Sequence, residues 1–280
     1  MRLATNISTA LQKAVVCLDE DVLYCIMKAR ETETSPSSLA VLDAIIQNLD
    51  VAKAQQLPMC QDTGMFLVFV DVGRACTLSL GDIEDAINEG CKDAVEKAYF
   101  RRSVVNEPLF ERRNTETNLP PVIWWNLVEG SALTIRILLK GFGSENTSSV
   151  RMLNPTASTD DVVSSVKQIV ALAGAKPCPP IFVGVGLGGS MDRAAYLSKR
   201  ALLRNVDEPH SDTRYAALEK QILDELQTLN IGSGGLGGGI TALHVAIETE
   251  PTHIAGLPLA VSINCWADRK AVIVWEADHA

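Results

Sequence analysis

Three of the seven cysteines in the sequence lie where their thiols could act together. Cys60, Cys178 and Cys265 occur in the segments PMCQDTG, PCPP and NCWADR, each a predicted turn at the edge of a predicted strand. Proline, glycine or asparagine beside each thiol favours such a turn, in which a side chain can be aimed at a shared point. Thiolates from three distant segments are typical of a site that forms only on folding, unlike a short C-x-x-C metal knuckle.

The number of thiols restricts the kind of metal site. Structural zinc sites take four ligands, and electron-transfer clusters usually take four cysteines. Three cysteines around a [4Fe–4S] cube would instead leave one iron with an open position, able to act as a Lewis acid. Spacing alone leaves a second interpretation open, in which Cys60, Cys178 and Cys265 are unrelated buried thiols.

The other four cysteines have the pattern of small buried hydrophobes. Cys17, Cys25 and Cys91 lie inside helical runs, and Cys76 lies at a strand-to-helix junction. We expect none of them to carry chemistry.

The composition is that of an ordinary globular chain and excludes several function classes. The 280 residues include 25 Lys and Arg against 34 Asp and Glu, a net charge of −9, and 47% are hydrophobic. Because nucleic acids and anionic membranes bind basic surfaces, neither is expected as a partner. No apolar run approaches the roughly 18 residues that span a bilayer, and the N-terminal segment lacks the pattern of a secretory signal. Seven cysteines are too few for a disulfide scaffold, so we expect a cytoplasmic protein with reduced thiols.

Hydrophobic periodicity predicts an α/β (mixed α+β) fold, with mixed or antiparallel sheets flanked by helices. The predicted helices cover residues 5–30, 35–56, 81–100, 159–175, 191–204 and 210–230. The predicted strands cover 65–72, 122–128, 132–140, 181–185, 257–264 and 271–278, and 241–249 fits either element. The strands at 122–128 and 132–140 are adjacent in the chain, which favours a hairpin. We treat 1–280 as one catalytic domain, in which residues 1–100 are a candidate helical lobe.

Helix N-caps are predicted from Ser, Thr and Asp residues at the starts of periodic runs. The candidates are Asp82, Ser158 or Thr159, and Ser211. Gly174 is the predicted end of the fourth helix, because glycine commonly follows a helix C-terminus.

One glycine pattern matches the dinucleotide-binding fingerprint. Gly184-x-Gly186-x-x-Gly189 follows a predicted strand and opens a predicted helix, with Asp207 eighteen residues further on. No strand is predicted near Asp207, so close packing of backbone against the glycines is the favoured interpretation. A third interpretation is an anion, such as a substrate carboxylate, held by the loop and the helix N-terminus.

Several long segments resemble one family. PMCQDTG, KGFGSEN, CPPIFVGVGLGG, IGSGGLGGG and THIAGLPLAVSINCWADR occur, in this order, between about residues 30 and 275. They are similar to the α-subunit, or N-terminal half, of the iron–sulfur (class I) fumarase and L(+)-tartrate dehydratase family. The resemblance implies that Cys60, Cys178 and Cys265 ligate a [4Fe–4S] cluster. It also implies reversible hydration of fumarate to L-malate, with the open iron as Lewis acid.

The resemblance also implies roles for residues near the cysteines. The implied catalytic residues are Asp62 and His253, and the implied substrate-binding residues are Gln61, Arg101, Arg102 and Gly143. The sequence does not choose between Arg101 and Arg102. Asp62 has a structural alternative as the side chain that closes a turn before Gly64, and an isolated histidine such as His253 is usually structural.

The chain departs from fused members of the family in one respect. In those proteins the proton-abstracting residue lies in a C-terminal domain, within a segment that this sequence lacks. The resemblance therefore implies a separate β-subunit that carries the catalytic base, a small dicarboxylate substrate and an α2β2 assembly.

Other functions remain open from the sequence. L(+)-tartrate dehydratase, which forms oxaloacetate, is the first alternative, although KGFGSEN is more similar to the fumarase side of the family. A second class is a non-catalytic subunit. It would hold either a sensing iron–sulfur cluster or zinc, the latter bound by Cys60, Cys178, Cys265 and His253.

Overall fold

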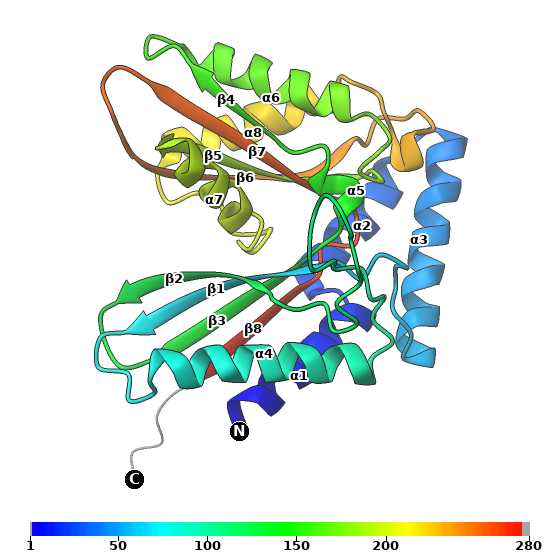
Figure 1. The fold of residues 1–280 in the computed structure, drawn as a ribbon. Helices are drawn as coiled ribbons and strands as arrows, with labels where there is room; N and C mark the ends of the chain where they lie inside the picture. Colours follow the sequence, from blue (N-terminus) through cyan, green and yellow to red (C-terminus); the bar gives the residue numbers. More distant parts are fainter. Residues whose placement is uncertain (1, 276–280) are drawn as a thin grey trace. The chain divides into compact units, whose positions relative to one another are not determined.

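The computed structural model describes residues 2–275, which form two compact units (Figure 1). Unit 1 contains the chain up to Asp19, the segment Asn48–Gly141 and the chain from Arg269 onward, and unit 2 contains Glu20–Gln47 and Phe142–Asp268. Each unit has a mixed sheet flanked by helices, so the predicted α/β fold class is confirmed. Neither unit coincides with residues 1–100, the candidate helical lobe. Within residues 2–275, no helix is both long and apolar enough to cross a membrane.

Unit 1 is a four-stranded sheet with two helices on one face (Figure 1). Its strands, in spatial order, are β2 (Val122–Val128), β1 (Met65–Gly73), β3 (Leu133–Lys140) and β8 (Lys270–Trp275). The covering helices are α1 (Arg2–Val16) and α4 (Leu80–Lys97). Alternate side chains such as Val68 and Val70 of β1 point toward these helices and form the core.

The predicted hairpin of 122–128 and 132–140 is wrong. β1 lies between β2 and β3, parallel to the first and antiparallel to the second. β1 is the most apolar of the three and is buried on both faces along most of its length. A strand of this kind is stabilised most at the centre of a sheet, and local adjacency of β2 and β3 cannot compete with that burial.

Unit 2 has a second four-stranded sheet with helices on both faces (Figure 1). Its strands, in spatial order, are β4 (Ser149–Leu153), β7 (Leu257–Asn264), β5 (Ile181–Gly189) and β6 (Ala242–Thr252). Helices α6 (Thr159–Ala173) and α8 (Thr213–Gln227) pack on one face, and α7 (Met191–Ala201) packs on the other. The remaining helices are α2 (Glu20–Thr32), α3 (Pro36–Gln55), which continues into unit 1, the short α5 (Phe142–Glu145) and the 3₁₀ turn Ser233–Gly235.

The fingerprint glycines serve close packing. A Cβ on Gly184 would lie 2.0 Å from the carbonyl oxygen of Ser198, and one on Gly186 would lie 2.1 Å from that of Ala194. Helix α7 therefore lies directly on the backbone of β5, where only glycine leaves enough room. This confirms the packing interpretation of the motif.

Replacing Gly186 by alanine is expected to destabilise the protein by about 1–3 kcal/mol, because the added methyl group overpacks the contact with α7. Denaturant unfolding would measure the change. Gly81→Ala in α4 is the matched control, since a Cβ there meets no atom nearer than 3.8 Å. Wild-type stability of Gly186→Ala would contradict this account of the motif.

Several predicted boundaries shift by a few residues. The helix expected over 5–30 is two helices, α1 and α2, separated by residues 17–19. Ser79, not Asp82, is the N-cap of α4, and Asp212, not Ser211, is the N-cap of α8. Ser79 lies three residues before Asp82 and accepts its backbone N–H, whereas Asp212 lies one residue after Ser211 and accepts the N–H of Arg214.

Other boundaries are confirmed or filled in. Ser158 caps α6 with a reciprocal hydrogen-bond pair to Asp161, and Gly174 ends the same helix. The ambiguous segment 241–249 lies, from Ala242 onward, in strand β6, and an additional strand, β4, follows the KGFGSEN segment. The strand predicted over 271–278 is present to Trp275, and its remainder lies outside the described residues.

A buried carboxylate anchors the glycine-rich segment Gly232–Gly239, here called the Gly-rich loop. Glu33, which is 6% exposed, accepts hydrogen bonds from the backbone N–H groups of Gly239 and Ile240. Burial opposes ionisation of this carboxylate. Hydrogen bonds from Ser35, Ser38 and the neighbouring backbone outweigh burial and lower the pKa of Glu33 to about 2.

The low pKa of Glu33 predicts acid sensitivity. Because the pKa of Glu33 is about 2 in the folded chain and ordinarily 4.5, ionised Glu33 stabilises the fold above pH 4.5, and this contribution is lost as the pH falls toward 2. The shift corresponds to up to about 3 kcal/mol. Urea unfolding between pH 7 and pH 2 would show it. In Glu33→Gln this part of the acid dependence should be missing, and an unchanged dependence would contradict the assignment.

Candidate active site

The Cys60 segment forms a loop in unit 1 that is held at both ends. Its entry is fixed at Met59, whose backbone N–H donates to the carbonyl oxygen of Val15 at 3.0 Å and whose carbonyl accepts from Asn48 Nδ2 at 2.8 Å. Gly64, at the exit, has a φ of +90°, and a Cβ there would lie 2.8 Å from backbone atoms at the end of β3. Only glycine fits this position. It therefore determines how the chain turns from the half-buried Cys60 into β1.

Asp62 closes the turn within this loop. Its Oδ1 accepts the backbone N–H of Gly64 at 3.1 Å, as the structural interpretation of Asp62 predicts. The carboxylate also lies over Gly141, where a Cβ would come within 3.3 Å of Asp62 Oδ2. Gln61, next to Asp62, is exposed. The turn contact does not exclude a catalytic role, because it uses one carboxylate oxygen.

Arg269 contacts the Cys60 loop and was not among the residues expected at the site. Its Nη2 donates to the carbonyl oxygen of Asp62 at 2.8 Å, and the side chain is 1% exposed. Its Nε and Nη1 are buried and have no hydrogen-bond partner among the described residues. Burying a guanidinium is costly, and the hydrogen bond to the carbonyl oxygen of Asp62 ties this one to the Cys60 loop. The available signal was the arginine that ends CWADR, directly before the apolar strand β8.

Arg101 and Arg102 differ in how they are held. The backbone N–H of Arg101 donates to Thr63 Oγ1 at 3.1 Å, which ties Arg101 to the Cys60 loop. The side chain of Arg102 forms an ion pair with Glu116 at 3.0 Å instead. Both arginines are exposed. Arg101 is thus the one whose backbone is linked to the loop, and Arg102 is the one already engaged by a carboxylate.

Cys178 and Cys265 lie at the same end of the unit 2 sheet. β5 and β7 are antiparallel, and Phe182 near the start of β5 pairs with Asn264 at the end of β7. Cys178 lies shortly before that start, and Cys265 directly follows that end. The chain topology therefore places both cysteine turns at the same end of the sheet. Two ligands of one cluster would have to lie in this way.

Each of the two turns has its own supports. Cys178 has a φ of +56°, an unusual backbone conformation for a non-glycine residue, and its thiol is exposed. The turn around Cys265 is closed by Asn264 Nδ2, which donates to Asp268 Oδ1 at 2.6 Å, with both side chains 1% exposed. Cys91, by contrast, lies in the core of unit 1, and burial raises the pKa of its thiol to about 12.

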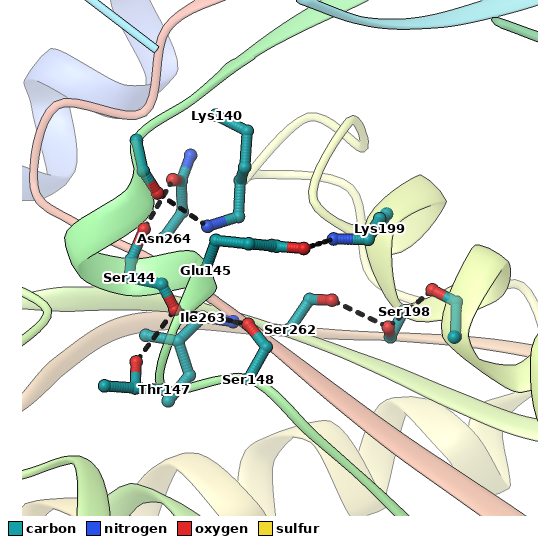
Figure 2. Close-up of polar contacts among 12 residues, drawn as sticks. Lys140, Ser144, Glu145, Thr147, Ser148, Ser198, Lys199, Ser262, Ile263 and Asn264 are labelled. Atoms are coloured by element: carbon teal, nitrogen blue, oxygen red, sulfur yellow. Dashed lines mark hydrogen bonds and ion pairs between the residues drawn. The ribbon is translucent and has the colours of Figure 1, made fainter. Parts of the chain in front are cut away.

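Helix α5 brings Gly143 to the same end of unit 2. A Cβ on Gly143 would lie 3.4 Å from the carbonyl oxygen of Lys176, two residues before Cys178. On the other side of α5, Ser144 Oγ lies 3.5 Å from Asn264 Oδ1. Figure 2 shows an ion pair between Glu145 of α5 and Lys199 of α7. Gly143 therefore lies between the Cys178 and Cys265 turns.

The structure does not bring His253 together with Cys265 within one chain. His253 follows β6, and Thr252 at the end of β6 pairs with Gly189 at the far end of β5. At about 3.3 Å per residue along β7, this puts the two ends of the strand on the order of 25 Å apart. His253 is exposed, and its Nδ1 accepts the backbone N–H of Ala255 at 3.1 Å. It has the contact of a turn residue, at the opposite end of β7 from Cys265.

The three-cysteine arrangement stays a prediction. Cys60 belongs to unit 1, and Cys178 and Cys265 belong to unit 2. Among residues 2–275, no group of three or more His, Cys, Asp or Glu side chains is arranged to hold a metal ion.

Comparisons with known proteins identify the family to which the chain belongs. The family described as fumarate hydratase (Fumerase) matches residues 4–274. A protein of Methanocaldococcus jannaschii, provisionally named an L(+)-tartrate dehydratase subunit alpha, is 41% identical over 278 residues, which are 97% of each chain. The L(+)-tartrate dehydratase subunit alpha of Escherichia coli O157:H7 is 30% identical over 263 residues, 93% of this chain and 86% of its own. The chain therefore belongs to the fumarate hydratase (Fumerase) family of hydro-lyases.

Proposed function

We propose that the chain is the α-subunit of an iron–sulfur hydro-lyase that interconverts fumarate and L-malate, with the catalytic base supplied by a separate β-subunit. The observation that carries the proposal is the placement of Cys178, Cys265 and Gly143 at one end of the unit 2 sheet. Family membership and relatives named as alpha subunits support it.

The cysteines proposed as ligands fit a thiolate site. A metal ligand must be a thiolate, and burial in an apolar core disfavours that form, as the raised pKa of Cys91 illustrates. Cys178 is exposed, and Cys60 and Cys265 are half-buried, so none of them carries the burial of Cys91. These three cysteines would hold a [4Fe–4S] cluster. When bound, the cluster supplies an open iron that acts as a Lewis acid toward the C2 hydroxyl of malate.

The residues of unit 1 are proposed to orient the dicarboxylate. A guanidinium can clamp a carboxylate through two parallel hydrogen bonds, and Arg101 is better placed than Arg102 because Glu116 already pairs with Arg102. Asp62 and Gln61 would position the hydroxyl group that leaves as water. In unit 2, the backbone N–H of Gly143 would donate to the second carboxylate. His253 has no part in this proposal, since its strand separates it from Cys265.

L(+)-tartrate dehydration is the second candidate, and the names of the relatives favour it. Tartrate differs from malate by one hydroxyl group, so both substrates present the same two carboxylates and the same leaving hydroxyl. A few pocket atoms that pair with the extra hydroxyl can discriminate strongly between them. The choice therefore depends on the pocket rather than on the fold.

Co-expression with a β-subunit is expected to raise hydro-lyase activity at least about 100-fold over this chain alone, because proton abstraction needs the base that the β-subunit carries. Both preparations would be reconstituted with iron and sulfide without oxygen, then assayed with L-malate, fumarate and L(+)-tartrate. We expect the larger kcat/KM with malate and fumarate. Full activity of this chain alone would contradict the two-subunit proposal, and a preference for tartrate would assign the second candidate function.

A further inference from the structure

Glu33 has an unusual set of partners for a buried acid. Its Oε1 accepts the backbone N–H groups of Thr34, Ser35 and Gly239, at 2.8, 2.9 and 3.2 Å. Its Oε2 accepts the hydroxyl of Ser38 at 2.9 Å and the N–H of Ile240 at 3.1 Å. All five partners are donors, so the ionised form suits this position. The acid joins the start of α3 to the end of the Gly-rich loop.

The same cluster continues through the Gly-rich loop. Ser38 Oγ, which donates to Glu33, accepts the backbone N–H of Ser233 at 3.0 Å, and Ser38 and Ser233 are fully buried. The next residue, Gly234, donates its N–H to the carbonyl oxygen of Pro179 at 2.8 Å. Pro179 directly follows Cys178. An unbroken series of contacts therefore runs from Glu33 to the turn that carries a proposed cluster ligand.

Close packing fixes the spacing along this series. A Cβ on Gly238 would lie 2.6 Å from Glu33 Oε2, and one on Gly235 would lie 2.2 Å from Ala175 Cβ, at the start of the Cys178 turn. The loop thus fills the space between Glu33 and residues 175–179. Cys178 itself has a φ of +56°, a conformation that is strained for a non-glycine residue and persists only where its surroundings impose it.

We propose that Glu33 is a positioning residue for Cys178, acting through Ser38 and the Gly-rich loop to hold the Cys178 turn in its left-handed conformation. The role of Cys178 as a cluster ligand rests on the proposed function, whereas the mechanical link from Glu33 to Cys178 does not. The inference explains why a buried anion held by four backbone N–H groups and one hydroxyl occupies the α2–α3 turn. It also assigns the Gly-rich loop the role of holding the Cys178 turn, whereas the proposed dicarboxylate chemistry assigns the loop no role.

Glu33→Gln tests the link, because the amide NH2 of glutamine would face backbone donors and would loosen the loop. Glu219→Gln is the matched control. Glu219 is also 6% exposed, but it accepts from Arg204, His210 and Ile247 instead of the Gly-rich loop. Ser38→Ala is a milder second variant, which removes the hydroxyl between Glu33 and Ser233 and leaves the carboxylate in place. Circular dichroism would confirm that each full-length variant folds.

The first readout is the alkylation rate of Cys178 in the metal-free chain, mapped by peptide mass spectrometry and compared with Cys265 in the same sample. We expect a change of at least about threefold in Glu33→Gln and Ser38→Ala, and none in Glu219→Gln. The second readout is the rate at which the reconstituted protein, with its partner subunit, loses iron to a chelator. Here Glu33→Gln should be about tenfold faster than wild type.

Equal effects of Glu33→Gln and Glu219→Gln on both readouts would overturn the inference, since both variants would then act only through general stability. If the wild-type protein binds no iron, the proposed function fails. The alkylation rate of Cys178 would still decide whether Glu33 positions this residue.

Discussion

Replacing Cys265 by serine is expected to remove bound iron and to lower kcat by about 10³-fold or more. A serine hydroxyl is a poor iron ligand. Loss of the cluster would remove the Lewis acid, which contributes several kcal/mol to transition-state stabilisation. The fold should survive, because the turn at this position is closed by Asn264 and Asp268 rather than by the thiol. Iron and sulfide content per chain and the rate of malate dehydration would be measured on anaerobic preparations.

Cys25→Ser is the matched control for this experiment. Cys25 is half-buried like Cys265, but it lies inside α2 and has no predicted role. It should retain iron and activity. A Cys265→Ser protein that keeps both would show that Cys265 is an ordinary structural thiol, and the three-cysteine site would have to be abandoned.

Asp62→Asn is expected to lower kcat by about 10²–10⁴-fold while changing the free energy of unfolding by less than about 1 kcal/mol. The asparagine side chain keeps an oxygen that can accept the N–H of Gly64, so the turn should persist. It loses the negative charge and the second carboxylate oxygen, which are the features proposed to act on substrate. Steady-state kinetics and thermal unfolding on the same preparation separate the two interpretations of Asp62.

Asp161→Asn provides the comparison for a purely local role. Asp161 also accepts a backbone N–H in a turn, from Ser158 at 2.7 Å, but it belongs to the cap of α6. This variant should keep wild-type kcat. If Asp62→Asn behaves in the same way, Asp62 only closes its turn.

The sequence was informative where a local pattern determines the structure. The continuous apolar run 65–72 predicted a buried strand, and Ser158 and Gly174 predicted the two ends of α6. It was less informative about strand pairing, because β2 and β3 are neighbours in the chain, yet β1 lies between them. Pairing is decided by burial over the whole sheet, and that quantity cannot be read from the loop between two strands.

The same limit applies to the candidate site. Turn residues around Cys178 and Cys265 predicted turns that could aim both thiols at a shared point, and the sheet register places both turns at one end. His253 illustrates the opposite case, since a short separation in sequence becomes a long one when the intervening residues form an extended strand. Arg269 and Glu33 could not be predicted as buried. Charged side chains are usually exposed, and here their partners are backbone groups from distant segments.

The most direct test of the central claim is electron paramagnetic resonance of the anaerobically purified and reduced protein, recorded with and without L-malate. The account predicts the spectrum of a [4Fe–4S] cluster, lost in Cys60, Cys178 and Cys265 variants and shifted when malate binds beside the open iron. A cluster spectrum indifferent to both malate and tartrate would indicate a non-catalytic sensor. Zinc in place of iron would contradict the account outright.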